Sequence, residues 1–246
     1  VRTKDGAEGF GEAKAAVGSA GDCASLVTIV ERELGPALIG QDPRHITRAW
    51  ERMYCGSRGD LALSRGRSFP DVARRGPRVA AIGAIDTALW DLAGKAHGVP
   101  VVELLGGACH DRLPAYASGG WADADGIGAE LQRFVDLGFG AVKMRVGAMD
   151  RRVETSAARV LAAREALGPD IELMIDAHGT CSLPEAKRLM RLVEGANLRW
   201  FEEPTPLDDH AAAAELRATT DVPIAVGESL STRFDFADVL RLRAAD

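Results

Sequence analysis

The sequence predicts an α/β fold, in which an α+β domain precedes a TIM-type barrel of alternating strands and helices. Three observations predict it. Residues 1–110 carry a hairpin pattern followed mainly by helical patterns. From residue 113 onward, strand and helix patterns alternate five times. The repeat length is 24 to 31 residues, which is typical of βα units in a parallel sheet. We therefore expect two domains, 1–110 and 111–246.

The first domain begins with "VRTKDGAEGFGEA", which predicts a hairpin because "DGAEG" is a turn sequence. An apolar stripe at Leu26, Ile29, Val30 and Leu34 predicts a helix, and Gly35-Pro36 predicts a break. "DPRHITRAWERMY" predicts a second helix with Asp42 as its N-cap.

Residues 57–77 are polar, arginine-rich and interrupted by glycine, so we expect a mobile loop. "RVAAIGAIDTALWDLAGKAHG" predicts a long buried helix that ends at Gly98.

The second domain is predicted to contain five strand–helix pairs. The strands are "LPAYASGG", "GAVKMRV", "IELMIDAHG", "LRWFEEP" and "VPIAVGES", and the helices that follow them are 125–137, 150–167, 182–194, 207–218 and 233–244. A doubly wound sheet and a (β/α)₈ barrel both fit this alternation. "ASGGWADADG" after the first strand lacks the G-x-G-x-x-G spacing of a nucleotide-binding turn, which favours the barrel.

Composition excludes several classes of protein. The 246 residues are 46% apolar and 27% charged, which is ordinary for a globular protein. A net charge of −6 argues against a nucleic-acid or anionic-membrane partner, and no apolar run is long enough to span a membrane. The four scattered cysteines form no C-x-x-C pair and are interpreted as reduced thiols of a cytoplasmic protein.

One carboxylate falls at the end of each of three consecutive strands. Asp176, Glu202 and Glu228 are each 26 residues apart. The carboxyl ends of parallel barrel strands converge on one mouth, where barrel enzymes keep their chemistry. Three carboxylates in one pocket repel each other unless a cation is present, and all-oxygen ligands favour Mg²⁺. The alternative is that each acid only begins a loop.

Two cations lie on the preceding strand. Lys143 and Arg145 are two residues apart and so project from the same face. Buried cations need partners, and the acids of the next strand are suitable ones. An inward orientation would place Val142, Met144 and Val146 beneath the helices. In the alternative, both cations face outward with their heads in water.

His178 is two residues past Asp176 and on the same side of the strand. It is either a structural hydrogen-bonding residue or, beside a metal ligand, an acid/base or substrate contact. Glu203 is expected to face away from Glu202 and to form a structural ion pair.

The combination of Lys143-x-Arg145, "DAH", "FEEP" and "GES" resembles the enolase superfamily, in its mandelate racemase/muconate lactonizing enzyme branch. "GFGEA" and "AIDTALWDLAGKAHGVPVVELLGG" resemble the capping domain of that branch. The resemblance implies that Asp176, Glu202 and Glu228 bind Mg²⁺, and that a substrate carboxylate joins them. It also implies that abstraction of the proton α to this carboxylate gives an enediolate.

The resemblance implies a Mg²⁺-dependent carbon–oxygen lyase that dehydrates a sugar acid, an aldonate or aldarate. Lys143 and Arg145 would stabilise charge, and His178 would protonate the departing hydroxyl. Arginine stays protonated and is a poor base, which argues against two-base racemisation. A racemase, epimerase or cycloisomerase is the alternative, and a non-catalytic, metal-stabilised paralogue is a second.

Five βα units do not close an eight-stranded barrel. We therefore expect a truncated chain that is inactive by itself and belongs to a longer, homo-oligomeric enzyme. The capping loops of this family select the substrate, which makes Arg58, Arg65 and Arg67 candidate substrate contacts. The alternative is that they belong to a solvated loop.

Overall fold

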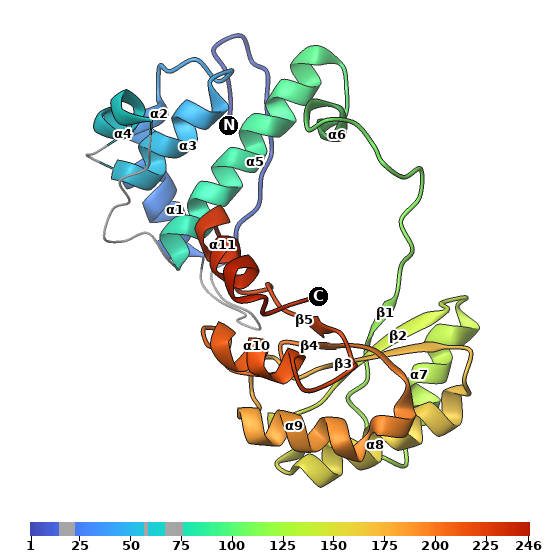
Figure 1. The fold of residues 1–246 in the computed structure, drawn as a ribbon. Coiled ribbons are helices and arrows are strands. Elements are labelled where there is room, and N and C mark those ends of the chain that lie inside the picture. Colours follow the sequence, from blue (N-terminus) through green and yellow to red (C-terminus); the bar gives the residue numbers. More distant parts are fainter. Residues whose placement is uncertain (15–22, 57–58, 67–75) are drawn as a thin grey trace. The chain divides into compact units, whose positions relative to one another are not determined.

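The computed structural model describes residues 1–14, 23–56, 59–66 and 76–246 (Figure 1). The chain divides into two compact units, Val1–Asp111 and Arg112–Asp246. The first unit is mainly helical, and the second holds a parallel sheet with helices between its strands.

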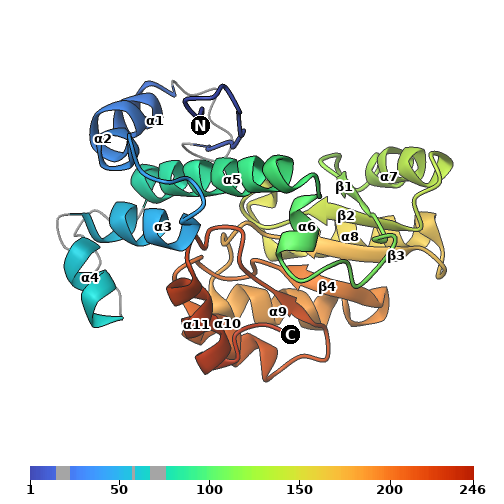
Figure 2. The same cartoon turned by 90° about the horizontal axis from the view of Figure 1, so that it is seen from above.

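The first unit contains six α-helices among its described residues. They are α1 (Ala24–Thr28), α2 (Gly35–Leu38), α3 (Ile46–Cys55), α4 (Gly59–Arg65), α5 (Pro77–His97) and α6 (Val101–Leu104), and the π-helical turn η1 (Ile29–Leu34) joins α1 to α2. The long helix α5 runs beside α3, as Figures 1 and 2 both show. It ends at Gly98 in the left-handed conformation (φ +68°), as predicted, because glycine has no Cβ to oppose that conformation.

The hairpin at the start of the chain is confirmed. Arg2 and Glu8 form an antiparallel bridge across the turn. The returning strand then lies against α5 without space for a side chain, since a Cβ on Gly9 would lie 2.0 Å from the Ala88 carbonyl oxygen. The "GFG" sequence is therefore required by the close approach of strand and helix.

Three local predictions in this unit were wrong. Helical structure continues through Gly35-Pro36 to Leu38, because proline is tolerated in the first turn of a helix. The N-cap of α3 is His45 instead of Asp42, whose carboxylate accepts the Arg44 N–H in a turn before the helix.

The predicted loop 57–77 contains helix α4, whose Leu and Ala residues favour helix over loop. Arg65 is exposed at the end of this helix. Arg58 and Arg67 lie outside the described residues.

The second unit is built on five parallel strands in chain order. They are β1 (Ala117–Gly119), β2 (Ala141–Arg145), β3 (Glu172–Asp176), β4 (Leu198–Glu202) and β5 (Ile224–Ala225). The helices that follow them are α7 (Ile127–Asp136), α8 (Val153–Leu167), α9 (Leu183–Leu192), α10 (His210–Arg217) and α11 (Arg233–Leu242). Short 3₁₀ turns, η3 (Ala148–Asp150) and η4 (Glu194–Ala196), precede α8 and β4. The alternation predicted from the sequence is present, as an incomplete barrel.

The core of this unit lies between the sheet and its helices. The apolar strand residues Val142, Met144, Leu173, Ile175 and Phe201 belong to one buried cluster with residues of α7, α8 and α9. In Figure 1 these three helices lie on one face of the sheet. The alternate strand residues, which include Lys143 and Arg145, project from the other face.

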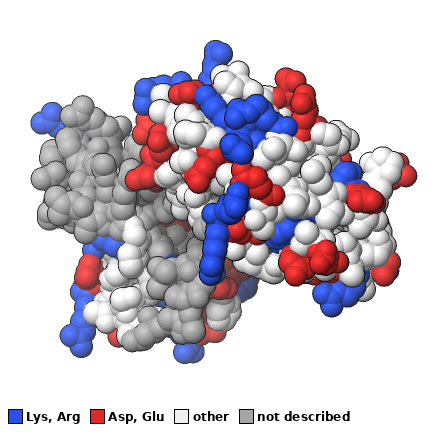
Figure 3. All heavy atoms as spheres, turned by 90° about the horizontal axis from the view of Figure 1, so that it is seen from below, with Lys and Arg blue, Asp and Glu red and all other residues white. Residues whose placement is uncertain are grey.

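Further features concern the charged surface, the helices and the cysteines. The face in Figure 3 carries Lys/Arg and Asp/Glu side chains close to one another. Among the described residues, no helix is both long and apolar enough to cross a membrane. None of the four cysteines forms a disulfide, and burial raises the pKa of the Cys181 thiol to about 11.

Candidate functional site

Strand register brings the predicted site residues of β2, β3 and β4 together at the carboxyl ends of these strands. Arg145 pairs with Asp176, and Asp176 pairs with Glu202. Glu202 in turn pairs with Ala225, at the end of β5, so Glu228 lies three residues beyond the strand in the loop that follows. The predicted residues therefore share the carboxyl edge, with Glu228 on a loop instead of a strand.

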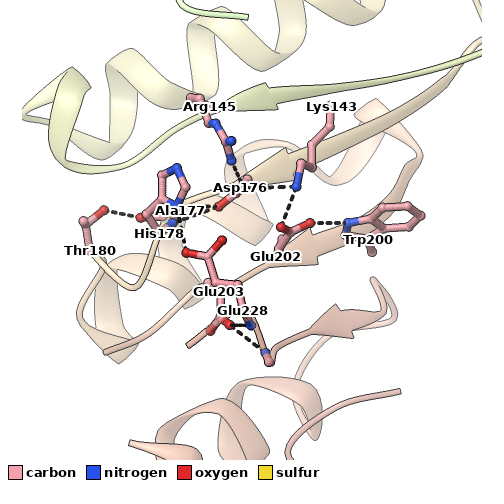
Figure 4. Close-up of polar contacts among 11 residues, drawn as sticks. Lys143, Arg145, Asp176, Ala177, His178, Thr180, Trp200, Glu202, Glu203 and Glu228 are labelled. Carbon is pink, nitrogen blue, oxygen red and sulfur yellow. Dashed lines mark hydrogen bonds and ion pairs between the residues drawn. The ribbon is translucent and has the colours of Figure 1, made fainter. Parts of the chain in front are cut away.

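Lys143 and Arg145 face the acids. The Lys143 ammonium lies 2.5 Å from Glu202 Oε1 and 3.2 Å from Asp176 Oδ2, and Arg145 forms an ion pair with Asp176 (Figure 4). Asp176 is fully buried and Lys143 is 5% exposed. Charges buried to this degree are stable only when paired, which explains why the inward orientation prevails.

His178 joins Asp176 to Glu228. Its Nδ1 atom lies 3.1 Å from Glu228 Oε1 and 3.7 Å from Asp176 Oδ1. The backbone at His178 is left-handed (φ +48°), and its N–H donates to Asp176 Oδ1 at 3.0 Å. A non-glycine residue in this region is held there by its surroundings, and such residues are frequent at functional sites.

Two of the three predicted metal ligands lie close enough to a third side chain to bind one ion. Asp176, His178 and Glu228 each offer one atom, and these atoms lie within 4.8 Å of one another. Glu202 is outside this group, and its carboxylate contacts Lys143 and the Trp200 indole N–H, the latter at 3.2 Å. The structure thus gathers two of the three predicted carboxylates with His178.

Glu203 contacts the backbone instead of the basic side chain that we expected. It is 3% exposed, and its Oε1 accepts the N–H groups of Gly227 at 2.6 Å and Glu228 at 3.0 Å. Burial raises the pKa of its carboxyl group, and the Glu228 and Glu202 carboxylates add to this, while the two N–H groups act against it. Glu203 therefore fixes the backbone of the loop that carries Glu228.

The donor set fits a hard dication. Asp176 Oδ2 is buried without a hydrogen-bond partner, although the two cations are within ion-pair range. The carboxylates of Asp176, Glu202 and Glu228 outnumber the ammonium of Lys143 and the guanidinium of Arg145, which leaves a formal excess of one negative charge. Carboxylate oxygens are the ligands that Mg²⁺ prefers.

Sequence reasoning missed two contributors. The sequence predicts an ion pair for Glu203 and no role for Trp200. Trp200 is two residues before Glu202 on one strand, so the period of two could have placed both on the same face. No comparable signal exists for the Glu203 contact, which depends on how the next loop folds.

Two family descriptions match most of the chain. Residues 1–106 match "Mandelate racemase / muconate lactonizing enzyme, N-terminal domain", and residues 126–246 match "Enolase C-terminal domain-like". The chain belongs to the enolase superfamily, in its mandelate racemase/muconate lactonizing enzyme branch. The resemblance inferred from the sequence is thereby confirmed.

Curated relatives of this enolase-superfamily chain are named as sugar-acid dehydratases. An arabinonate dehydratase from Saccharolobus solfataricus is 32% identical over 251 residues, covering 100% of this chain and 62% of the relative. A D-galactonate dehydratase from Ralstonia nicotianae is 37% identical over 248 residues, covering 98% and 60% respectively. The chain spans about 60% of the length of these relatives.

Solved structures of this branch share the fold. A racemase from Streptomyces coelicolor A3(2) with bound magnesium superposes with a TM-score of 0.84 at 32% identity, covering 99% of this chain and 64% of that one. The 3,6-anhydro-D-galactonate cycloisomerase from Zobellia galactanivorans superposes with a TM-score of 0.83 at 30% identity, covering 99% and 61%. The relatives are thus enzymes of more than one reaction class.

Proposed function

We propose that the full-length protein is a Mg²⁺-dependent lyase that dehydrates a sugar acid, an aldonate or aldarate. One observation carries the proposal. Arg145, Asp176 and Glu202 are paired in register at the carboxyl ends of three adjacent strands, and the Lys143 ammonium lies between the two acids. The dehydratase names of the curated relatives support the substrate class.

The ion is proposed to be held by Asp176, Glu202 and Glu228. Glu202 would have to exchange its contact with Lys143 for the ion. The proton on the carbon beside a carboxylate is a very weak acid, so its removal requires stabilisation of the negative charge that develops on the carboxylate oxygens. When bound, Mg²⁺ would supply part of this stabilisation.

Lys143 and Arg145 have different proposed roles. Arg145 stays protonated at working pH, and its Nη1 atom pairs with the buried Asp176 carboxylate at the carboxyl end of the sheet. Its proposed role is to bind an anionic oxygen of the substrate with its remaining N–H groups. Lys143 lies between two carboxylates and stabilises charge on the reacting acid, or takes the α-proton in its neutral form.

His178 is the proposed acid for the departing β-hydroxyl group. Its side chain is about one third exposed, and Nδ1 is directed at Glu228, so Nε2 remains for the substrate. The His178→Asn variant should lose dehydration by about 10²–10⁴-fold, the usual contribution of one acid or base. Exchange of the α-proton with solvent deuterium should continue in that variant, because a different group removes this proton.

The test is an assay of the full-length protein with aldonates and aldarates, with Mg²⁺ and after its removal by a chelator. Formation of a 2-keto-3-deoxy acid that depends on Mg²⁺ is the expected result. Absence of this product with every sugar acid tested would contradict the proposed reaction.

An isomerase is the second candidate, and the racemase and cycloisomerase among the structural neighbours favour it. Both reactions begin with loss of the α-proton, so the same assay separates them. Uptake of solvent deuterium at the α-carbon without loss of water would favour a racemase, epimerase or cycloisomerase.

A non-catalytic, metal-stabilised paralogue is tested with Glu202→Gln, which removes one charge without changing the shape of the side chain. In an enzyme this variant stays folded and loses turnover. A folded Glu202→Gln protein with unchanged biological activity would favour the scaffold.

A further inference from the structure

A buried arginine on α8 connects the carboxyl ends of β1 and β2. Arg159 is 2% exposed, and its guanidinium donates to three backbone carbonyl groups. Nε donates to Ala122 O at 2.7 Å, Nη2 to Gly120 O at 2.8 Å, and Nη1 to Arg145 O at 2.7 Å. One planar cation thus fixes the backbone of Arg145 relative to the end of β1.

Asp150, the counter-ion of Arg159, links Arg159 to the backbone that follows β2. Asp150 lies 3.0 Å from Nη1 and is nearly buried. It accepts the Ser156 hydroxyl at 2.6 Å, and the Gly147 N–H donates to that hydroxyl oxygen at 3.1 Å. Gly147 is two residues past Arg145, so the backbone that follows the Arg145 side chain is held at two successive points.

An acid on α7 holds the other backbone groups at the end of β1. Glu130 accepts the N–H groups of Gly120, Trp121 and Ala122 at 3.1, 2.9 and 2.7 Å. Burial acts to raise the pKa of the Glu130 carboxyl group, but the three N–H groups and the nearby Arg133 outweigh it, so the pKa is lowered from its ordinary value. Residues 120–122 are therefore fixed by a carboxylate and a guanidinium from neighbouring helices, an arrangement that we call the Glu130–Arg159 clamp.

The clamp presents a large aromatic side chain next to Arg145. Trp121 is 58% exposed although its backbone is firmly held. The Arg145 guanidinium lies 5.8 Å from the centre of its ring. A flat apolar surface beside a cation matches a polyhydroxy acid, whose C–H groups pack on aromatic rings and whose carboxylate binds a guanidinium.

A second arginine on the same helix provides a comparison. Arg164 also donates to backbone carbonyl groups, those of Gly168, Ile171 and Ala196, each at 2.7 Å. These residues precede β3 and β4, at the amino ends of the strands. In parallel barrels that end serves stability, and the carboxyl end serves catalysis.

We propose that the Glu130–Arg159 clamp is a positioning device that fixes Trp121 and Arg145 as a binding pair for a sugar acid. The substrate class rests on the proposed function. The residues of the clamp do not touch the substrate, and they act through the orientation of this pair.

The test uses the full-length protein and compares Arg159→Lys with Arg164→Lys. Both variants keep the charge and lose the planar fork. Arg159→Lys should raise the KM for the sugar acid at least tenfold and change kcat less, whereas Arg164→Lys should lower the melting temperature and leave KM unchanged. Equal KM values for both variants, or a wild-type KM for Arg159→Lys, would overturn the proposal.

A double variant shows whether Arg159 acts through Trp121. Trp121→Ala should raise KM by itself, and adding Arg159→Lys should raise it little further, since the ring that the clamp positions is already gone. Independent, multiplicative effects on KM would contradict the proposed connection.

Binding measurements separate this proposal from the proposed function. Calorimetry with D-galactonate and Mg²⁺ gives a Kd without turnover. If the wild-type protein binds this acid and does not dehydrate it, the lyase assignment fails, and the same pattern among the variants is then expected in Kd. If neither aldonates nor aldarates bind to the wild-type protein, the binding pair is refuted as well.

Discussion

At the scale of single residues, the position of Glu228 depends on its neighbour across the sheet. Glu228 lies on a loop, and a loop residue is held less firmly than a strand residue. Glu203 compensates for this, because its Oε1 accepts two consecutive N–H groups of that loop. Residues that hold a metal ligand in place commonly affect metal affinity when they are replaced, and Glu228 is a proposed ligand.

We therefore expect Glu203→Leu to weaken Mg²⁺ affinity by about 10- to 100-fold in the full-length protein. Glu203→Gln is the matched control, since the amide oxygen can accept the same two N–H groups. Titration calorimetry measures both affinities, and circular dichroism checks that each variant is folded. Equal losses in the two variants would show that charge matters and that the backbone contact does not.

At the scale of elements, the segment after β1 depends on an ionised acid. The pKa of the Glu130 carboxyl group is lowered, so its contribution to stability is fully present above the ordinary pKa of glutamate and is lost as the pH falls through the lowered pKa. Wild type should thus be more stable than Glu130→Gln at pH 7, by about 1–3 kcal/mol for hydrogen bonds to a charged group. Urea unfolding at pH 7 and below pH 4 should show this difference shrinking in acid, and a constant difference would contradict the assignment.

The packing of the N-terminal hairpin segment around Gly9 against α5 gives a second prediction at this scale. Gly9→Ala places a Cβ against the Ala88 carbonyl, so it should destabilise the first unit by about 1–3 kcal/mol. Gly83 lies on the exposed side of α5, and a Cβ added there would have no atom within 4 Å. Gly83→Ala should therefore be neutral or stabilise the protein by up to about 1 kcal/mol. Urea unfolding compares the two variants, and similar effects would refute the close approach.

At the scale of the whole molecule, the five-stranded sheet has two edges. β1 and β5 each pair with one neighbour, and exposed strand edges promote association with other chains. The curated relatives are longer than this chain by a length that could supply further βα units. We expect residues 1–246 expressed alone to aggregate and to show no turnover, while the full-length protein is soluble and active. Light scattering and the dehydration assay test this, and an active, monomeric 246-residue chain would contradict it.

The sequence by itself determined the fold class and the edge on which the polar residues gather. Apolar periodicity fixes which residues can be buried, and strands of period two place Lys143 and Arg145 on one face. Consecutive βα units align the carboxyl ends of neighbouring strands, which made the proximity of Asp176 and Glu202 predictable.

Only the tertiary structure decided which partner each polar group takes. The pairing of Glu202 with Lys143, the contact of Glu203 with the Glu228 loop, and the contacts of Arg159 with three carbonyl groups join residues 14 to 59 positions apart. Local sequence carries periodicity but not these distances. Hydrogen bonds and ion pairs need atoms within about 3 Å, and that precision comes only from the packed fold.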